Sequence, residues 1–240
     1  MKEQPRDILS ILKKSKRIAF IPQTEEKQAA YTTESKFGGL PYLNKESDWC
    51  ICSGCNRPMS LFVQLNLEET PIKYANNKGL LQVFYCTTLT CNLANENYVP
   101  FNAGVVVRRL EVNTEQCAIL TQLPDGLMIF PENRINKWSK VEDYPHPESY
   151  HTLDIIWNET TNDILEDFEP AIEGDKIGGY PAFVQGHQIV FDPEDNTPYT
   201  FLMQIDSQDN LPFMFGDMGR AYVCYHPQKP DKLALFWQSY

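Results

Sequence analysis

The stretch Lys36-Phe37-Gly38-Gly39-Leu40-Pro41 decides the fold, because its pattern returns later in the chain as Lys176-Ile177-Gly178-Gly179-Tyr180-Pro181. When the chain is shifted so that Lys36 falls on Lys176, two segments align without a gap, and ten of fifty positions are identical. About three identities are expected by chance from ordinary residue frequencies. Each copy reads K-x-G-G-x-P, then a strand carrying Gln, a glycine turn and a strand ending in Tyr. This spacing predicts two tandem copies of one β-unit.

Apolar periodicity predicts strands for most of the chain and only two short helices. The predicted helices are an amphipathic one at Ile8–Lys16 and an acidic one at Asn162–Phe168, which Pro170 ends. Runs rich in β-branched and aromatic residues predict strands; they are Leu61–Leu67, Leu80–Cys86, Gly104–Val112, Cys117–Leu123, Tyr199–Ile205, Arg220–Tyr225 and Leu233–Tyr240. We therefore expect a mainly β (α+β) fold, in which two pseudo-repeats pack into a single duplicated domain after a short N-terminal helix.

The expected division of the chain follows the repeat. It comprises an N-terminal helical segment (1–30), a first β-repeat (31–125), a connecting segment with an acidic linker (126–170) and a second β-repeat (171–240). The stretch from Glu159 to Asp175 holds seven carboxylates and no basic residue. Such a run is typical of a solvated linker, and the alternative is an acidic face for a basic client.

The charge balance limits the classes of partner that we expect the protein to bind. The 240 residues include 21 Lys plus Arg and 32 Asp plus Glu, which gives a net charge of −11. This balance disfavours binding to nucleic acid, which relies on clustered basic residues, and favours a basic partner. No apolar run approaches the length of a membrane helix, and the N-terminus lacks the features of a secretory signal, so we expect a cytoplasmic protein.

Four of the seven cysteines are spaced as metal ligands. Cys52 and Cys55 form a CxxC pair, and Cys86 and Cys91 form a second pair with four residues between them. Two such pairs in a reducing compartment predict a tetrahedral, structural Zn²⁺ site, with Gly54 supplying the flexibility of the first turn. Free thiols are the alternative. A thioredoxin-like motif is disfavoured because no βαβ pattern surrounds the CxxC pair.

The other cysteines have different expected places. Cys50 is an alternative ligand to Cys52, but its spacing makes a poorer turn. Cys117 and Cys224 lie in apolar runs and are expected in the core.

The repeat places other potential ligands opposite the four cysteines. These counterparts are Asp192, Asp195, His226 and Asp231. They are candidates for a second metal site, although the sequence Phe191-Asp-Pro-Glu-Asp-Asn-Thr-Pro198 also forms a turn without metal. The sequence leaves the choice open.

Gln64 and Gln204 lie inside apolar strands, where a buried amide needs hydrogen-bond partners. The simpler expectation is that each pins its strand to the backbone of a neighbouring loop, and the alternative is ligand binding. If a binding groove lies between the repeats, we expect it near Lys36, Gln64, Lys176, Gln204 and Asp217.

Motifs for catalysis are missing from the sequence. There is no GxSxG nucleophile elbow, HExxH helix or GxxxxGK loop. His146 and His151 lie in a proline-containing stretch without a nucleophile nearby in sequence. We therefore expect a protein without catalytic residues, while noting that catalytic groups can converge in three dimensions.

Three quoted segments resemble known families. Ser35–Leu43 (SKFGGLPYL), Cys52–Leu67 and Lys78–Cys86 (KGLLQVFYC) resemble the bacterial YwqG-like family, and the second repeat resembles its carboxy-terminal part. The CxxC, the RPM…Q strand and the second cysteine pair also resemble the programmed cell death protein 2 family. The resemblance implies a duplicated β fold and zinc ligands at Cys52, Cys55, Cys86 and Cys91. Since many YwqG-like proteins lack these cysteines, the chain is identified as a zinc-bearing variant.

The eukaryotic relatives act as chaperones for a ribosomal protein. The resemblance and the acidic charge together predict a non-enzymatic, zinc-stabilised binding protein, a chaperone or assembly factor for a basic protein or peptide client. The alternatives are an enzyme or RNA-processing factor that uses the groove between the repeats, and a bacterial immunity protein.

Overall fold

The computed structural model describes residues 5–27, 31–93, 96–113, 115, 117–119, 122–156, 158–165, 168, 171–207 and 209–240. The helices of this part are α1 (Pro5–Lys14) and α2 (Glu159–Leu165), with short 3-10 turns η1 (Glu46–Asp48), η2 (Leu67–Glu69), η3 (Ala75–Asn77) and η5 (Pro147–Leu153). The strands are β1 (Arg17–Glu26), β2 (Lys36–Phe37), β3 (Ser60–Asn66), β4 (Leu80–Tyr85), β5 (Val105–Leu110), β6 (Asn133–Asp143), β7 (Lys176–Gly178), β8 (Thr200–Asp206), β9 (Arg220–His226) and β10 (Lys229–Gln238).

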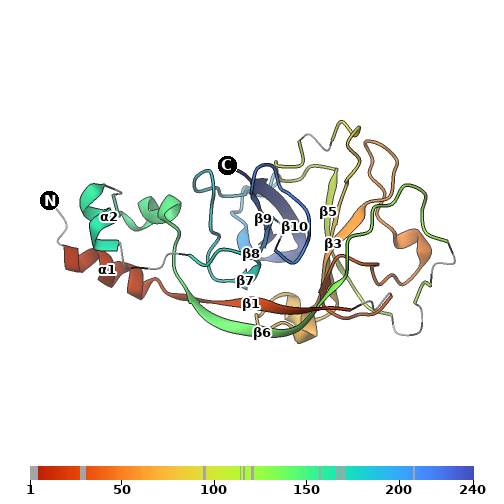
Figure 1. Cartoon of the computed structure of the whole chain (residues 1–240), viewed down its shortest axis with the longest axis horizontal. Coiled ribbons are helices and arrows are strands. Elements are labelled where there is room, and N and C mark those ends of the chain that lie inside the picture. Colours follow the sequence, from red (N-terminus) through yellow and green to blue (C-terminus); the bar gives the residue numbers. More distant parts are fainter. Residues whose placement is uncertain are drawn as a thin grey trace.

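The ten strands form one antiparallel sheet in the order β10-β9-β8-β7-β1-β6-β2-β3-β4-β5. The long strands β1 and β6 pair along their length and lie in the middle of this order (Figure 1). They join β2–β5 on one side to β7–β10 on the other. The two edge strands, β5 and β10, contact each other, so the curved sheet is nearly closed.

The strands on the two sides of the β1–β6 ribbon are paired in the same way. Lys36 pairs with Gln64 between β2 and β3, and Lys176 pairs with Gln204 between β7 and β8. The ladder shifts register after Leu61 in the first set and after Phe201 in the second. Each of these positions falls on its counterpart under the same shift that carries Lys36 onto Lys176 in the sequence repeat.

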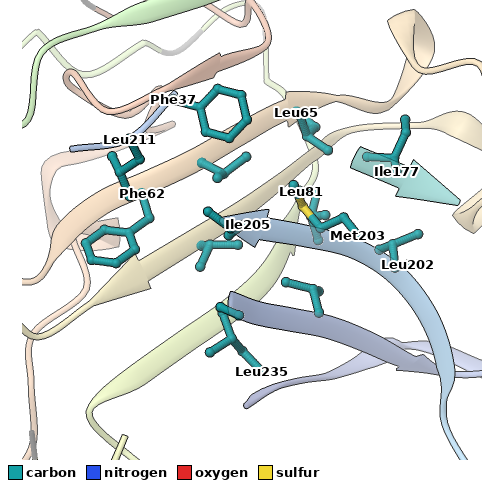
Figure 2. Close-up of a cluster of buried hydrophobic side chains, with 14 of the residues drawn as sticks. Phe37, Phe62, Leu65, Leu81, Ile177, Leu202, Met203, Ile205, Leu211 and Leu235 are labelled. Atoms are coloured by element: carbon teal, nitrogen blue, oxygen red, sulfur yellow. The ribbon is translucent and has the colours of Figure 1, made fainter. Parts of the chain in front are cut away.

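One hydrophobic core lies between the two sets of strands. Figure 2 shows Phe62 and Leu65 of β3 in the same cluster as Met203 and Ile205 of β8. The rings of Phe62 and Phe213 are 4.7 Å apart. Removal of these apolar side chains from water supplies the main driving force for closing the sheet.

Most predicted strands form within a few residues of their expected bounds. Residues 117–119 and 122–123, which belong to the predicted strand Cys117–Leu123, form no strand, and the Cys117 side chain is exposed. The prediction that Cys117 lies in the core is therefore wrong. Cys224 is buried in β9, as predicted.

The sequence did not predict β1 and β6, the two central strands. β1 occupies part of the expected N-terminal helical segment, and β6 lies in the expected connecting segment. Most side chains of both strands are at least partly exposed. Their sequences therefore lack the alternation of apolar and polar residues that marks a half-buried strand. Their long mutual ladder, rather than a strong local pattern, holds them in the sheet.

The helices gather at one end of the β1–β6 ribbon (Figure 1). Leu12 of α1, Leu165 of α2 and Tyr150 of η5 share a small buried cluster. Lys13 and Lys14 lie in the last turn of α1, where positive charge suits the helix dipole. Within the described residues, no helix combines the length and the apolar character needed to cross a membrane.

Candidate metal centre

The sulfur atoms of four cysteines meet at one place in the first half of the sheet. Sγ of Cys52 lies 3.7 Å from Sγ of Cys91, and Sγ of Cys55 lies 3.7 Å from Sγ of Cys86. All four sulfurs lie within 4.8 Å of one another. Zinc bound to four thiolates at about 2.3 Å in a tetrahedron places the sulfurs about 3.8 Å apart. The cluster has the dimensions of such a site, as the sequence predicted for these residues.

Backbone hydrogen bonds hold the first cysteine pair on a tight hairpin. The amide of Cys52 donates to the carbonyl of Arg57 (2.9 Å), and the amide of Asn56 donates to the carbonyl of Cys52 (2.8 Å). Asn56 has a φ of 58°, a conformation that Asn adopts more easily than most residues. These bonds hold the hairpin whose two thiols belong to the cluster.

Gly54 has a different role from the expected one. It does not adopt a positive φ, so conformational freedom does not explain it. A Cβ atom at this position would lie 2.6 Å from Cδ1 of Leu93 and 3.2 Å from Sγ of Cys91. Gly54 is needed because the second cysteine loop packs directly against the first.

The second pair follows β4. The amide of Cys86 donates to the carbonyl of Gly104 (2.9 Å), and the amide of Cys91 donates to the carbonyl of Thr88 (2.9 Å). A metal held here would tie the hairpin at Cys52 to the end of β4.

The environment differs among the four thiols. Burial raises the pKa of Cys86 to about 12 and raises the pKa of Cys52 as well. Burial also acts to raise the pKa of Cys55, but hydrogen bonds, led by the one from the backbone of Arg57, hold it at about 7. Cys50 is buried beside the cluster but is not one of the four thiols that converge. With four thiols and no water-binding position, the set is typical of a structural site rather than a catalytic one.

The second cluster proposed from the repeat forms in part. Asp192, Asp195 and His226 bring potential ligand atoms within 4.8 Å of one another. Asp231 instead pairs with Arg109 at 2.6 Å. Only three of the four counterparts of the cysteines therefore come together.

Lysine side chains already neutralise this second cluster. Nζ of Lys229 lies 2.7 Å from Asp195, and Nζ of Lys232 lies 3.1 Å from Asp192. Although burial acts to raise it, hydrogen bonds from the Glu194 amide and from Lys232 hold the pKa of Asp192 at about 2. Two ammonium groups thus supply the positive charge that a cation would bring.

The hairpin beneath this cluster has the same hydrogen bonds as the cysteine hairpin. The amide of Asp192 donates to the carbonyl of Thr197 (2.9 Å), and the amide of Asn196 donates to the carbonyl of Asp192 (2.9 Å). Asn196 has a φ of 59°. The two hairpins differ in the groups that hold them, four thiols in one and an ion-pair network in the other.

Four of the five residues expected in a groove between the repeats lie in the protein interior. Nζ of Lys36 lies 2.9 Å from Glu132, and Nζ of Lys176 lies 2.9 Å from Asp143, with both lysines fully buried. Of the five, Asp217 is the one that is exposed. The four buried side chains therefore do not line a surface groove in this structure, because each is engaged by internal partners.

The two glutamines follow the simpler expectation, which is confirmed. Oε1 of Gln64 accepts from the Tyr42 amide, and Nε2 of Gln64 donates to the carbonyls of Thr32 and Glu34. Gln204 makes the matching bonds to the Ala182 amide and the Gly174 carbonyl. Each amide pins its strand to the loop before it.

Sequence reasoning missed Glu132 and Asp143, the partners of the two buried lysines. Glu132 immediately precedes β6 and Asp143 is its last residue. Both are far in sequence from the lysines they contact, and nothing in their local pattern marks them. The Gly-Gly pairs make these contacts possible, since a Cβ at Gly39 would lie 2.0 Å from Glu132 and one at Gly179 would lie 2.1 Å from Asp143.

Residues 35–233 match the family described as "Domain of unknown function (DUF1963)". The chain belongs to this family. The YwqG-like proteins are members of it, so this part of the predicted resemblance is confirmed. In this DUF1963 protein the match covers both Gly-Gly motifs and both hairpins. No curated protein matches the chain.

Proposed function

We propose that this DUF1963 protein is a non-enzymatic, zinc-stabilised binding protein whose client is a basic protein or peptide. The observation that carries the proposal is the closed set of four thiols at Cys52, Cys55, Cys86 and Cys91, because such a set braces a fold and leaves no position for a substrate. The protein is then proposed to act by binding a partner at its surface, and the excess charge of the protein is negative.

The zinc is proposed to brace one of two copies of a duplicated β-unit, as in the zinc-bearing programmed cell death protein 2 family. Support comes from the two hairpins, which share their hydrogen bonds at positions that correspond in the sequence repeat. The copy at Asp192 is held by Lys229 and Lys232 instead. The proposal places the protein in a reducing compartment such as the cytoplasm, where the thiols stay available to the metal.

The charge distribution favours a basic client. Several cations are already engaged in ion pairs, among them Arg109 with Asp231 and Arg220 with Glu173. With a net charge of −11, the charge left for a partner is negative. A hollow of ≈ 720 Å³ between η3 and β5 is lined by the carboxylates Glu68 and Glu111 and by the cations Lys78 and Arg109, of which Arg109 is paired with Asp231. We propose this hollow as the contact for the client, with the exposed Glu68 and Glu111 meeting its positive charges.

The zinc part of the proposal is tested by measuring metal content. The full chain, purified without chelator, is expected to contain one zinc ion per chain by mass spectrometry of the metal. A Cys52→Ser, Cys55→Ser variant is expected to contain none. Zinc-free protein from careful preparations would refute a structural zinc.

The client part is tested with a labelled Lys/Arg-rich peptide at low and at high salt, beside an acidic peptide of the same length. We expect binding of the basic peptide alone, weakened by salt. A Glu68→Gln, Glu111→Gln variant is expected to lose most of it. The matched control, Glu159→Gln with Asp163→Asn, removes two exposed charges from α2 and is expected to bind as the natural protein does. Equal loss in both variants would show attraction by net charge alone, and no binding at low salt would overturn the proposal.

A further inference from the structure

A cavity of ≈ 380 Å³ lies in the second half of the protein, away from the thiol cluster. Side chains of β8, β9 and β10, including Phe201, Tyr222 and Phe236, form its apolar wall. Ser149 and Leu153 of η5 form part of the opposite wall. Arg17, the first residue of β1, also lines it.

The cavity is lined at two positions where the second half has a smaller side chain than the first half. There, the rings of Trp49 and Phe84 are in edge contact at 6.5 Å, and Trp49 is 8% exposed. The residues at the corresponding positions of the second repeat are Ile189 and Cys224.

The register of the strands confirms the correspondence of Phe84 and Cys224. Phe84 pairs with Leu61 across β4 and β3, and Cys224 pairs with Phe201 across β9 and β8. Ile189 lines the cavity and is 48% exposed, whereas Trp49 is buried in the first half. An indole and a phenyl ring are thus replaced by a half-exposed isoleucine and a thiol, both smaller than the groups they replace.

Arg17 provides a positive charge at this cavity. Its guanidinium lies 4.1 Å from the centre of the Tyr180 ring, and this contact fixes its position. The carboxylates next to it along β6 are engaged elsewhere, Glu142 with Lys16 and Asp143 with Lys176. The guanidinium is therefore placed to meet an anion from outside the chain.

The remaining polar groups fit binding rather than covalent chemistry. Oγ of Ser149 lies 2.9 Å from Nδ1 of His187, so each occupies a hydrogen-bonding position of the other. Burial, helped by the nearby His151, lowers the pKa of His187. Burial raises the pKa of Cys224 to about 12, so this side chain stays a neutral thiol and acts as part of the wall.

We propose that this cavity binds a small molecule with a flat aromatic body and one anionic group, with the body in the space that Trp49 and Phe84 fill in the first half and the anion at Arg17. Aromatic walls favour a flat apolar body, and guanidinium pairs well with carboxylate or sulfonate oxygens. The site is independent of the zinc and of the basic client.

Two fluorescent probes of nearly equal shape test the proposal on the full chain. They are 8-anilino-1-naphthalenesulfonate, which is anionic, and N-phenyl-1-naphthylamine, which lacks the sulfonate. We expect saturable binding of one probe molecule per chain, with the anionic probe bound about tenfold more tightly. Absence of saturable binding by either probe would overturn the proposal.

Variants then locate the site. Ile189→Trp with Cys224→Phe rebuilds the filled arrangement of the first half and is expected to abolish binding of both probes. The smaller replacement Cys224→Leu is expected to weaken binding of both probes, and it serves if the double variant does not fold.

Arg17→Gln is expected to remove the preference for the anionic probe and to leave binding of the neutral probe unaffected. The control Arg57→Gln changes an exposed arginine in the cysteine hairpin and is expected to change the binding of neither probe. Unchanged binding in a folded, filled variant would show that the probes bind elsewhere.

Discussion

Nζ of Lys176 lies 2.9 Å from Oδ2 of Asp143, and both side chains are completely buried. The same carboxylate oxygen accepts a hydrogen bond from the amide of Tyr180 at 2.8 Å. The pair links β7 to the end of β6, where the ribbon meets the second set of strands. A buried ion pair is costly to form, and it is still more costly to leave one charge without its partner.

Lys176→Met is therefore expected to lower the free energy of unfolding by about 3–5 kcal/mol, because it strands the Asp143 carboxylate. Urea unfolding followed by circular dichroism measures the change. Combining Lys176→Met with Asp143→Asn, which removes the charge and keeps a side-chain oxygen that can accept from the Tyr180 amide, is expected to recover much of the loss. Lys16→Met, at an exposed pair with Glu142, is the control and is expected to have little effect. A double variant as unstable as the single one would contradict the interpretation.

Removal of one proposed zinc ligand is expected to destabilise the first half of the sheet. Cys52→Ser is expected to lose roughly 3 kcal/mol or more of unfolding free energy, because metal binding energy is part of the folding energy. Calorimetry with and without a chelator measures it. In chelator, the natural protein is expected to approach the variant. Cys117→Ser changes an exposed cysteine outside the cluster and is expected to match the natural protein in both conditions.

Gly54→Ala is expected to push the two cysteine loops apart, because the new methyl group would meet Leu93 at 2.6 Å. We expect a loss of about 1–3 kcal/mol of stability together with weaker zinc binding in a competition titration. Pairing Gly54→Ala with Leu93→Ala makes room and is expected to restore zinc affinity. If the pair binds zinc no better than Gly54→Ala alone, the crowding argument fails.

The Asp192 network predicts a dependence on acid. The pKa of this carboxyl is about 2 in the folded protein, below the value of 3.8 for a free side chain. A lowered folded pKa contributes stability that is present above about pH 4 and is lost as the pH falls toward 2. Asp192→Asn is therefore expected to show a smaller drop in melting temperature over this range than the natural protein.

Asp163→Asn, which changes an exposed residue of α2, is the control for this prediction. It is expected to follow the natural protein at every pH. Both variants keep the four cysteines, so acid release of zinc affects them equally. Parallel curves for Asp192→Asn and the natural protein would show that the network adds nothing to acid stability.

Local sequence patterns were enough to predict the strands that have strong apolar runs and to predict the candidate metal ligands. Cys52 and Cys55 are so close in sequence that one tight turn brings their thiols together. The pair can therefore be recognised as candidate metal ligands from the sequence alone. The bonds of Gln64 and Gln204 followed from the need of a buried amide for partners.

The mainly β class of fold and the four converging thiols thus followed from the sequence, because apolar runs and cysteine spacing are patterns along the chain. The burial of Lys36 beside Glu132 and of Lys176 beside Asp143 emerged only from the tertiary structure, since those partners are set by strand order and not by spacing. The tertiary structure also decided that lysines neutralise the second cluster, and that a cavity opens where Ile189 and Cys224 replace two large rings. The volume left between side chains is a property of packing, which no local pattern records.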